Sequence, residues 1–209
     1  YDNDIDVLSA SWNDDKIAWY ENDGSKPPSW TNRTITTSAD FAHSVYAIDI
    51  DNDNDIDVLS ASFVDNKIAW YENDGASPPT WTVRTITTSA EFADSVFAID
   101  IDNDNDIDVL SASARDKKIA WYENDLNNTT SWTNRTITTS ADCADSVFAI
   151  DIDNDNDIDV LSASWFDDKI AWYENDGASP PSWTARTITT SAATAESVYA
   201  IDIDNDNDI

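Results

Sequence analysis

Hydrophobic and polar residues alternate along short segments of this chain. Four such segments follow one another at Ser44–Ile50, Ile56–Ser62, Lys67–Glu72 and Trp81–Thr88. They are rich in aromatic and β-branched residues and show no helical period. Turn-forming residues, among them a glycine and two prolines before Trp81, separate the segments. The pattern predicts four short β-strands and an all-β chain.

This four-strand unit recurs every 51 residues along the whole sequence. The run IAWYEND, for example, places equivalent tryptophans at Trp19, Trp70, Trp121 and Trp172. Periods of about 40–50 residues are typical of propellers and related arrays. Four strands per repeat make one blade of a β-propeller, which is the fold that we predict.

The repeat divides the chain into one incomplete blade, three complete blades and a remnant. Residues 1–40 supply the second to fourth strands of a blade, and residues 194–209 supply a lone first strand at Ser197–Ile203. The complete blades are predicted at residues 41–91, 92–142 and 143–193. Pairing of Ser197–Ile203 with Ile5–Ser11 within one chain would close a four-bladed ring, whereas pairing between chains would build a larger ring or a fibre. A third alternative is that the sequence is a window on a longer array.

An acidic loop joins the first and second strands of each unit. Asp49–Asp57 (DIDNDNDID) has an aspartate at every second position, and the same nine residues recur at Asp100–Asp108 and Asp151–Asp159. Such crowded charges repel one another unless a cation lies among them. Hard oxygen ligands on a tight loop suit Ca²⁺ best, and calcium is the cofactor that we predict. The candidate ligands in the complete loops are Asp49, Asp51, Asp53, Asp55, Asp57, Asp100, Asp102, Asp104, Asp106, Asp108, Asp151, Asp153, Asp155, Asp157 and Asp159.

Two broken copies of the loop lie near the ends of the sequence. One contributes Asp202, Asp204 and Asp206, and the other contributes Asp4 and Asp6. If the first and last strands pair, within or between chains, these five aspartates would form one further calcium site.

The repeat resembles the FG-GAP repeat, the calcium-binding blade of integrin-α-like and bacterial VCBS-type propellers. The family pattern D-x-D-x-D-G-x-x-D is matched by Asp49, Asp51, Asp53 and Asp57, with Asn54 in place of glycine. Asparagine tolerates a left-handed backbone better than other non-glycine residues. The preceding FAHSV also resembles the family's F-G-x-S-V. The resemblance implies a calcium-stabilised propeller in which Asp55 offers its backbone carbonyl. A register shifted by two residues, starting at Asp51, stays open.

Other interpretations of the acidic loop fit less well. An EF-hand loop that began at Asp49 would need a glutamate where Ser60 stands, inside a predicted strand. Glycine-rich nonapeptide loops are excluded because the chain has only three glycines. The remaining alternative is that the aspartates are solvated loop residues without a metal. Their identical spacing in every unit favours the metal.

Composition narrows the classes of partner. The formal net charge is −31, from 42 acidic and 11 basic residues, which argues against nucleic acid and anionic membranes as partners. No apolar run approaches the ~20 residues of a membrane helix, so no membrane span is expected. One histidine and one cysteine offer no repeated catalytic pair, and we predict that the chain is not an enzyme.

Positions that differ between units are the better candidates for a binding face. The turn between the second and third strands carries Trp12, Phe63, Ala114 and Trp165 at one position, followed by Asn13, Val64, Arg115 and Phe166. Trp12, Phe63 and Trp165 are therefore the predicted ligand-binding residues. The repeated tryptophans are instead expected to pack between blades, although stacking on carbohydrate is an alternative.

Three further expectations concern single residues. The repeated arginines, such as Arg84, are expected to pair with nearby carboxylates. Cys143 replaces Phe41 and Phe92 and is predicted to be a small buried side chain. Asn32, Asn128 and Asn134 lie in N-x-S/T sequons, which would carry glycans if the source organism glycosylates asparagine.

These observations predict a secreted or cell-surface propeller that calcium stabilises and that serves as an adhesion, structural or binding module. The near-identity of the units suits a fibre- or surface-forming glycoprotein, with calcium, carbohydrate or other copies of the chain as partners. The first alternative is a lectin-like carbohydrate-binding propeller. The second is the non-catalytic domain of a secreted polysaccharide-active enzyme.

Overall fold

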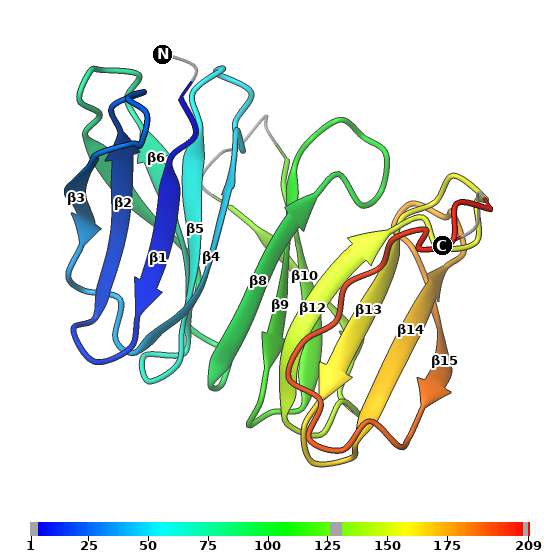
Figure 1. Ribbon diagram of the computed structural model, residues 1–209. Helices are drawn as coiled ribbons and strands as arrows, with labels where there is room; N and C mark the ends of the chain where they lie inside the picture. Colours follow the sequence, from blue (N-terminus) through cyan, green and yellow to red (C-terminus); the bar gives the residue numbers. More distant parts are fainter. Residues whose placement is uncertain (1–3, 126–130, 207–208) are drawn as a thin grey trace.

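The computed structural model describes residues 4–125, 131–206 and 209, and the described residues form fifteen strands and no helix (Figure 1). No helix that could serve as a membrane span occurs among them. The strands form separate antiparallel sheets that follow one another along the chain. The structure therefore confirms the all-β array of blades predicted from the 51-residue period.

Strands that are consecutive in sequence are neighbours in each sheet. The first sheet contains β1 (Val7–Ser11), β2 (Lys16–Asn22) and β3 (Trp30–Thr36). The second contains β4 (Ala42–Ile48), β5 (Asp57–Ser62), β6 (Lys67–Asn73) and β7 (Trp81–Thr87). The third contains β8 (Ala93–Ile99), β9 (Asp108–Ser113), β10 (Lys118–Glu123) and β11 (Thr133–Thr138). The fourth contains β12 (Ala144–Ile150), β13 (Asp159–Ser164), β14 (Lys169–Asn175) and β15 (Trp183–Thr189).

The hydrophobic core lies between the sheets rather than within any one of them. Trp70 of the second sheet and Tyr122 of the third belong to one buried cluster, and Trp121 and Tyr173 belong to the cluster between the third and fourth sheets. Trp132 packs edge-on against Trp70, with their ring centroids 6.5 Å apart. These contacts support the packing role predicted for the repeated tryptophans, because each sheet buries its apolar face against the next.

The first strands of successive blades lie side by side on the inner edge of the array. Ring contacts connect them: Tyr46 to Phe97 with centroids 4.8 Å apart, Phe97 to Phe148 at 5.0 Å, and Phe148 to Tyr199 at 4.6 Å. This aromatic ladder explains why the first strand is apolar on both faces. In β8, Val96 and Ala98 belong to the cluster shared with the second sheet, and Phe97 and Ile99 pack against the cluster shared with the fourth.

The repeated arginines pair as the sequence predicts. Arg84 Nη2 lies 2.6 Å from Glu72 Oε2, and the guanidinium also stacks over Trp70, 5.3 Å from the ring centroid. Register explains the contact, because Trp70 and Arg84 are cross-strand partners on β6 and β7. The equivalent ion pairs are Arg33–Glu21, Arg135–Glu123 and Arg186–Glu174.

The array is open, which excludes one of the three alternatives for its ends. Ser197–Ile203 does not form a hydrogen-bonded strand and does not pair with β1. It runs beside β12, where the Val198 amide donates to Ser146 Oγ at 3.3 Å (Figure 1). The edge of β1 lies at the opposite end of the array, so a four-bladed ring within one chain is not formed.

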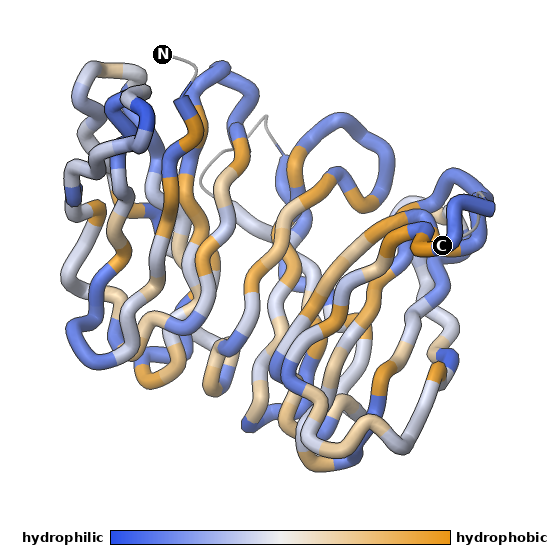
Figure 2. The backbone as a smooth tube through the Cα atoms, in the orientation of Figure 1, coloured by the Kyte–Doolittle hydropathy of each residue, from blue (hydrophilic) through white to orange (hydrophobic). Residues whose placement is uncertain are grey.

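The acidic loops and the turns between second and third strands lie at opposite ends of each blade. A first strand of seven residues separates them by about 20 Å, at about 3.3 Å per residue. Figure 2 shows hydrophilic residues gathered at the acidic loops, while the strands carry most of the hydrophobic residues. The two ends of a blade are therefore considered separately below.

Candidate metal sites and binding face

The acidic loop folds around its own first aspartate. Asp49 accepts hydrogen bonds from the Asp53 amide at 3.1 Å and from the Asn54 amide at 2.9 Å. Asn52 and Asn54 have φ values of 59° and 74°, which confirms the left-handed backbone expected where the family pattern has glycine. The same bonds and angles recur at Asp100 and Asp151.

The last aspartate of the loop is buried and fixed. Asp57, the first residue of β5, accepts the Asn73 amide at 2.8 Å and the Ile50 amide at 3.2 Å. Burial raises the pKa of Asp57 to about 6 and that of the equivalent Asp108 to about 8. Asn73 also donates through Nδ2 to the Ile56 carbonyl at 2.9 Å. The asparagine of every IAWYEND run thus positions this carboxylate, a role that its recurrence in the sequence could have suggested.

Three carboxylates converge in each complete loop, with ligand atoms within 4.8 Å of one another. The groups are Asp49–Asp51–Asp53, Asp100–Asp102–Asp108 and Asp151–Asp153–Asp159. Together they use the first, third, fifth and ninth positions of the loop, which are the four carboxylate positions of the FG-GAP pattern.

The seventh position belongs to none of these groups in the described residues. In two of the three complete loops its aspartate instead packs against a glycine in the loop after the third strand. A Cβ on Gly75 would lie 2.3 Å from Asp55 Oδ2, and Gly177 has the same relation to Asp157. The third member of this position is Asp106, whose unit has Leu126, outside the described residues, in place of the glycine. The geometry therefore favours the register that starts at Asp49.

The third position is where a cation is most needed. Asp51 Oδ1 and Asp102 Oδ1 are buried and have no hydrogen-bond partner among the described residues. Burial, reinforced by neighbouring carboxylates, raises the pKa of Asp51 and raises that of Asp102 to about 6. A hard divalent cation would satisfy these oxygens, and a set made only of carboxylate oxygens fits Ca²⁺.

A family model described as "FG-GAP-like repeat" matches residues 1–60, 49–111, 100–162 and 151–209. This chain belongs to the FG-GAP-like repeat family. The result confirms the resemblance deduced from the acidic loop. The chain matches no curated protein.

Solved structures share the fold of this FG-GAP array. A candidate 6-phosphogluconolactonase from Bacteroides uniformis has a TM-score of 0.58 at 11% identity, over 90% of this chain and 55% of that one. A functionally unknown protein from Desulfotomaculum acetoxidans has a TM-score of 0.55 at 10% identity, over 86% and 52%. A protein from Lactobacillus plantarum has a TM-score of 0.58 at 15% identity, over 88% and 53%. The array spans about half the length of each, and the likeness concerns the fold alone.

The broken copies of the FG-GAP loop do not come together. Asp202, Asp204 and Asp206 form a group of their own. At the other end of the array, Asp6 accepts hydrogen bonds from Trp19 Nε1 at 2.9 Å and from the Asn22 amide at 2.8 Å. Asp4 lies against Gly24, as Asp55 lies against Gly75. The further site expected from Asp4, Asp6 and Asp202–Asp206 is therefore not assembled within one chain, because the array is open.

The remaining loop aspartates have a local role. Asp53 accepts the amide of Asp55 at 2.8 Å, and Asp104 and Asp155 accept the equivalent amides of Asp106 and Asp157 at 2.9 Å. Each such bond tightens the second half of the loop.

At the opposite end of the blades, the predicted ligand-binding residues fall into two places. The Trp12 ring contacts Phe63, with centroids 5.3 Å apart, and Phe63 stacks on Phe92 at 4.3 Å. Trp165 lies two blades after Phe63 in the sequence, and both residues line one pocket. Cys143 lines the same pocket and is only partly buried, so the prediction of a small buried side chain is wrong in its burial.

The sequons lie apart from both ends. Asn32 on β3 and Asn134 on β11 are exposed on the last strand of their sheets. Asn128 lies outside the described residues.

Proposed function

We propose that this FG-GAP array is an extracellular, calcium-stabilised scaffold that binds a partner and has no catalytic activity. One observation supports the metal above all others. In each complete loop three carboxylates converge within 4.8 Å, and in two of the loops a buried carboxylate oxygen has no partner among the described residues.

Calcium would act on the fold rather than on a reaction. Each acidic loop joins the first and second strands and is tied through Asn73 or its equivalent to the end of the third strand. A cation in the loop would neutralise the crowded aspartates and connect three of the four strands. Binding of calcium to the folded state alone would then stabilise folding.

An extracellular location accords with sites of modest affinity. Extracellular modules of this kind bind calcium with Kd values of roughly 10⁻⁴–10⁻³ M, which extracellular calcium can fill. The 42 acidic residues outnumber the 11 basic residues, and the resulting negative charge also favours solubility.

The cysteine thiol and the histidine imidazole, which could serve as nucleophile and base, are poorly suited to catalysis. Burial and the nearby Asp145 raise the pKa of the Cys143 thiol to about 11, so the thiol is a weak nucleophile at neutral pH. His43, the one histidine, contacts Asp94 and has no hydroxyl or thiol hydrogen-bonded to it among the described residues. These features support a binding role.

Thermal melting with and without a chelator tests the proposal. At a calcium concentration of about 100 Kd each occupied site stabilises the fold by about 2.7 kcal/mol. Excess EGTA should therefore lower the melting temperature by roughly 10 °C or more, since three complete loops contribute. Added calcium should restore the original value, and magnesium at equal ionic strength should restore less of it.

Isothermal titration calorimetry of the chelated protein provides the count of sites. At least three calcium ions per chain are expected, one for each complete loop. A melting temperature that EGTA does not change, together with no heat of calcium binding, would contradict the proposal.

A further inference from the structure

Aromatic side chains fill the junctions between blades at the turn end. At the first junction Trp12 contacts Phe41, with centroids 4.9 Å apart. At the second junction Phe63 stacks on Phe92 at 4.3 Å and 12°. In both cases the residue after the second strand of one blade meets the residue before the first strand of the next.

The third junction lacks both aromatic partners. Ala114 stands where the other blades have Trp12, Phe63 and Trp165, and Cys143 stands where Phe41 and Phe92 lie. The backbone is nonetheless unchanged. The Ala114 amide donates to Phe92 O at 3.0 Å and the Trp165 amide to Cys143 O at 2.9 Å, as the Phe63 amide donates to Phe41 O at 3.1 Å.

A third substitution occurs at the same junction. Asp15, Asn66 and Asp168 each accept, through Oδ1, the amide of the residue that precedes the next first strand, at 2.9–3.0 Å. Lys117 occupies this position in the third blade and instead forms an ion pair with Asp142, with Nζ 2.8 Å from Oδ2.

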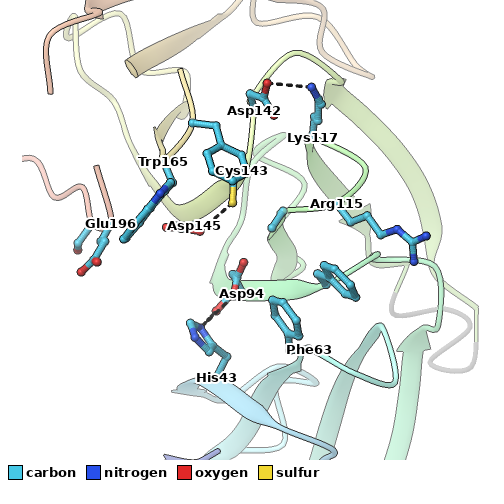
Figure 3. Close-up of a pocket in the computed structure, with 14 residues that line it drawn as sticks. His43, Phe63, Asp94, Arg115, Lys117, Asp142, Cys143, Asp145, Trp165 and Glu196 are labelled. Carbon is cyan, nitrogen blue, oxygen red and sulfur yellow. Dashed lines mark hydrogen bonds and ion pairs between the residues drawn. The ribbon is translucent and has the colours of Figure 1, made fainter. Parts of the chain in front are cut away.

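These differences leave a cavity of about 940 Å³ between the third and fourth blades. Phe63 and Phe92 line one side, and Trp165 and Phe166 line the other. Phe166 is 72% exposed. Figure 3 shows Trp165, Asp145 and Glu196 on one side of the cavity and His43, Asp94 and Phe63 on the other.

The charge that remains in the cavity is negative. Equivalent positions near the start of successive first strands carry Asp94, Asp145 and Glu196, with His43 at the first. His43 Nδ1 lies 3.2 Å from Asp94 Oδ1 (Figure 3). No lysine or arginine of the described chain forms an ion pair with Asp145 or Glu196.

The two basic residues of the wall are already engaged. Lys117 pairs with Asp142, and Arg115 lies 3.5 Å from Glu91 and over the Phe92 ring. They therefore do not neutralise Asp145 and Glu196.

We propose that this cavity binds a small organic cation that carries an ammonium group on an apolar body. Aromatic faces attract ammonium groups, and the carboxylates supply the opposite charge. The volume of the cavity exceeds that of a single ion. A bare divalent cation would be bound by oxygen ligands and not by aromatic walls. The cavity lies at the end of the blades away from the acidic loops, so the inference is independent of calcium binding there.

The ionisation of Asp94 and Asp145 would be coupled to the binding of this ligand. Burial and the charge of Asp145 raise the pKa of Asp94 to about 8, and burial and Glu196 raise that of Asp145, against the opposing effect of His43. A bound cation would favour the ionised carboxylates. The Cys143 thiol stays neutral, because its pKa is about 11.

The test compares benzylamine, which is protonated at neutral pH, with benzyl alcohol, which has the same ring and no charge. Binding is measured by calorimetry and by NMR chemical-shift changes at saturating calcium, with the complete chain. Benzylamine is expected to bind at least about tenfold more tightly than benzyl alcohol.

Two variants separate the cavity from the overall negative charge. Ala114→Phe with Cys143→Phe restores the aromatic pair seen at Phe63 and Phe92 and leaves every carboxylate in place. Phenylalanine already adopts the required left-handed backbone at Phe92, where φ is 57°, as at Cys143. This filled variant should lose benzylamine binding by at least about tenfold. Asp145→Asn, which keeps the cavity, should weaken benzylamine and leave benzyl alcohol unchanged.

Each contrary result would overturn the proposal. The outcomes are no benzylamine binding at millimolar concentration, equal binding of benzylamine and benzyl alcohol, and undiminished binding by a folded filled variant. The filled variant is used only if its circular dichroism spectrum shows that it folds. Otherwise Asp145→Asn decides the question, and equal benzylamine binding by this variant and the parent would overturn the proposal.

Discussion

The two ends of each blade are built on opposite principles. At one end the acidic loop is identical in all three complete copies, from Asp49, Asp100 and Asp151 onward. At the other end the turn keeps its backbone hydrogen bonds but changes its side chains, as Phe63, Ala114 and Trp165 illustrate. Identity is found where side chains hold the loop backbone, and variation where the backbone hydrogen bonds do not depend on the side chains.

The difference teaches where a repeat protein can acquire a specific function. In the acidic loop, Asp49 and Asp57 each accept two backbone amides, so a substitution there would disturb the loop itself. In the turn, the bond from the Ala114 amide to Phe92 O needs no particular side chain. A cavity could therefore arise at one junction without any change to the array.

The largest contrast is expected between two tryptophans. Trp121 is fully buried between the third and fourth sheets, whereas Trp165 is partly exposed in the cavity. Trp121→Ala should lower the free energy of unfolding by about 3–5 kcal/mol. Trp165→Ala should change it by less than about 1 kcal/mol and still reduce benzylamine binding. Urea unfolding of both variants at saturating calcium measures the difference, and equal losses would contradict it.

A smaller effect is expected at the acidic end, and its sign should depend on calcium. Asp102→Asn removes a converging carboxylate, so it should cost roughly 2 kcal/mol at saturating calcium. In EGTA the same change removes a buried repelling charge and should be neutral or slightly stabilising. Asp14→Asn is the matched control, because Asp14 is exposed and lies in no metal cluster of the described residues. A similar loss of stability with and without calcium would argue against a metal at Asp102.

The glycine beside the acidic loop provides a third test. Gly75 has φ of 66°, and an added Cβ would lie 2.3 Å from Asp55 Oδ2. Gly75→Ala should therefore destabilise the fold by about 1–2 kcal/mol, through backbone strain and displacement of the carboxylate. Ala76→Gly, one residue further on, is the control and should have little effect. Thermal melting measures the difference between the two variants. Equal melting temperatures for Gly75→Ala and Ala76→Gly would contradict the expectation.

The last effect concerns how the free energy of unfolding depends on pH through a carboxyl group at the turn end. Burial raises the folded-state pKa of Asp94 from its ordinary value of 3.8 to about 8, so its contribution to stability is complete below about pH 4 and is lost as the pH rises through 8. Asp94→Asn removes this dependence. The variant should gain stability relative to the parent as the pH rises from 5 to 8, because asparagine has no carboxyl group to ionise in this buried position. Four other ionisable groups line the same cavity, so Asp145→Asn should be measured in parallel; they belong to His43, Cys143, Asp145 and Glu196. A pH-independent difference between Asp94→Asn and the parent would be contrary evidence.

Much of the fold could be predicted because each signal is local and repeated. The alternation from Ser44 to Thr88 predicts four strands, and the asparagine at position 54 predicts a left-handed backbone there, which the structure confirms with φ of 74°. The Arg84–Glu72 pair follows from strand register, so it too could be predicted.

The features that the sequence does not predict are contacts that depend on three dimensions. Pairing of Ser197–Ile203 with β1 requires the array to curve into a closed ring, and sequence periodicity contains no measure of curvature. The cavity could be predicted only from the knowledge that Phe63 stacks on Phe92. That contact shows that the equivalent residues Ala114 and Cys143 face each other and are too small to fill the space between them. Each of these two residues alone looks like an ordinary small side chain.

The inner edge of the array has a mechanical consequence. The Ser44 hydroxyl accepts the Val96 amide at 3.3 Å, and Ser95 and Ser146 repeat this bond to Val147 and Val198, so equivalent links join each first strand to the next. An array joined by equivalent links should yield to a pulling force one blade at a time. Each event would release one 51-residue period, or about 170 Å of extended chain before the folded dimension is subtracted. Force spectroscopy would record the sequence period as a staircase of equal lengths.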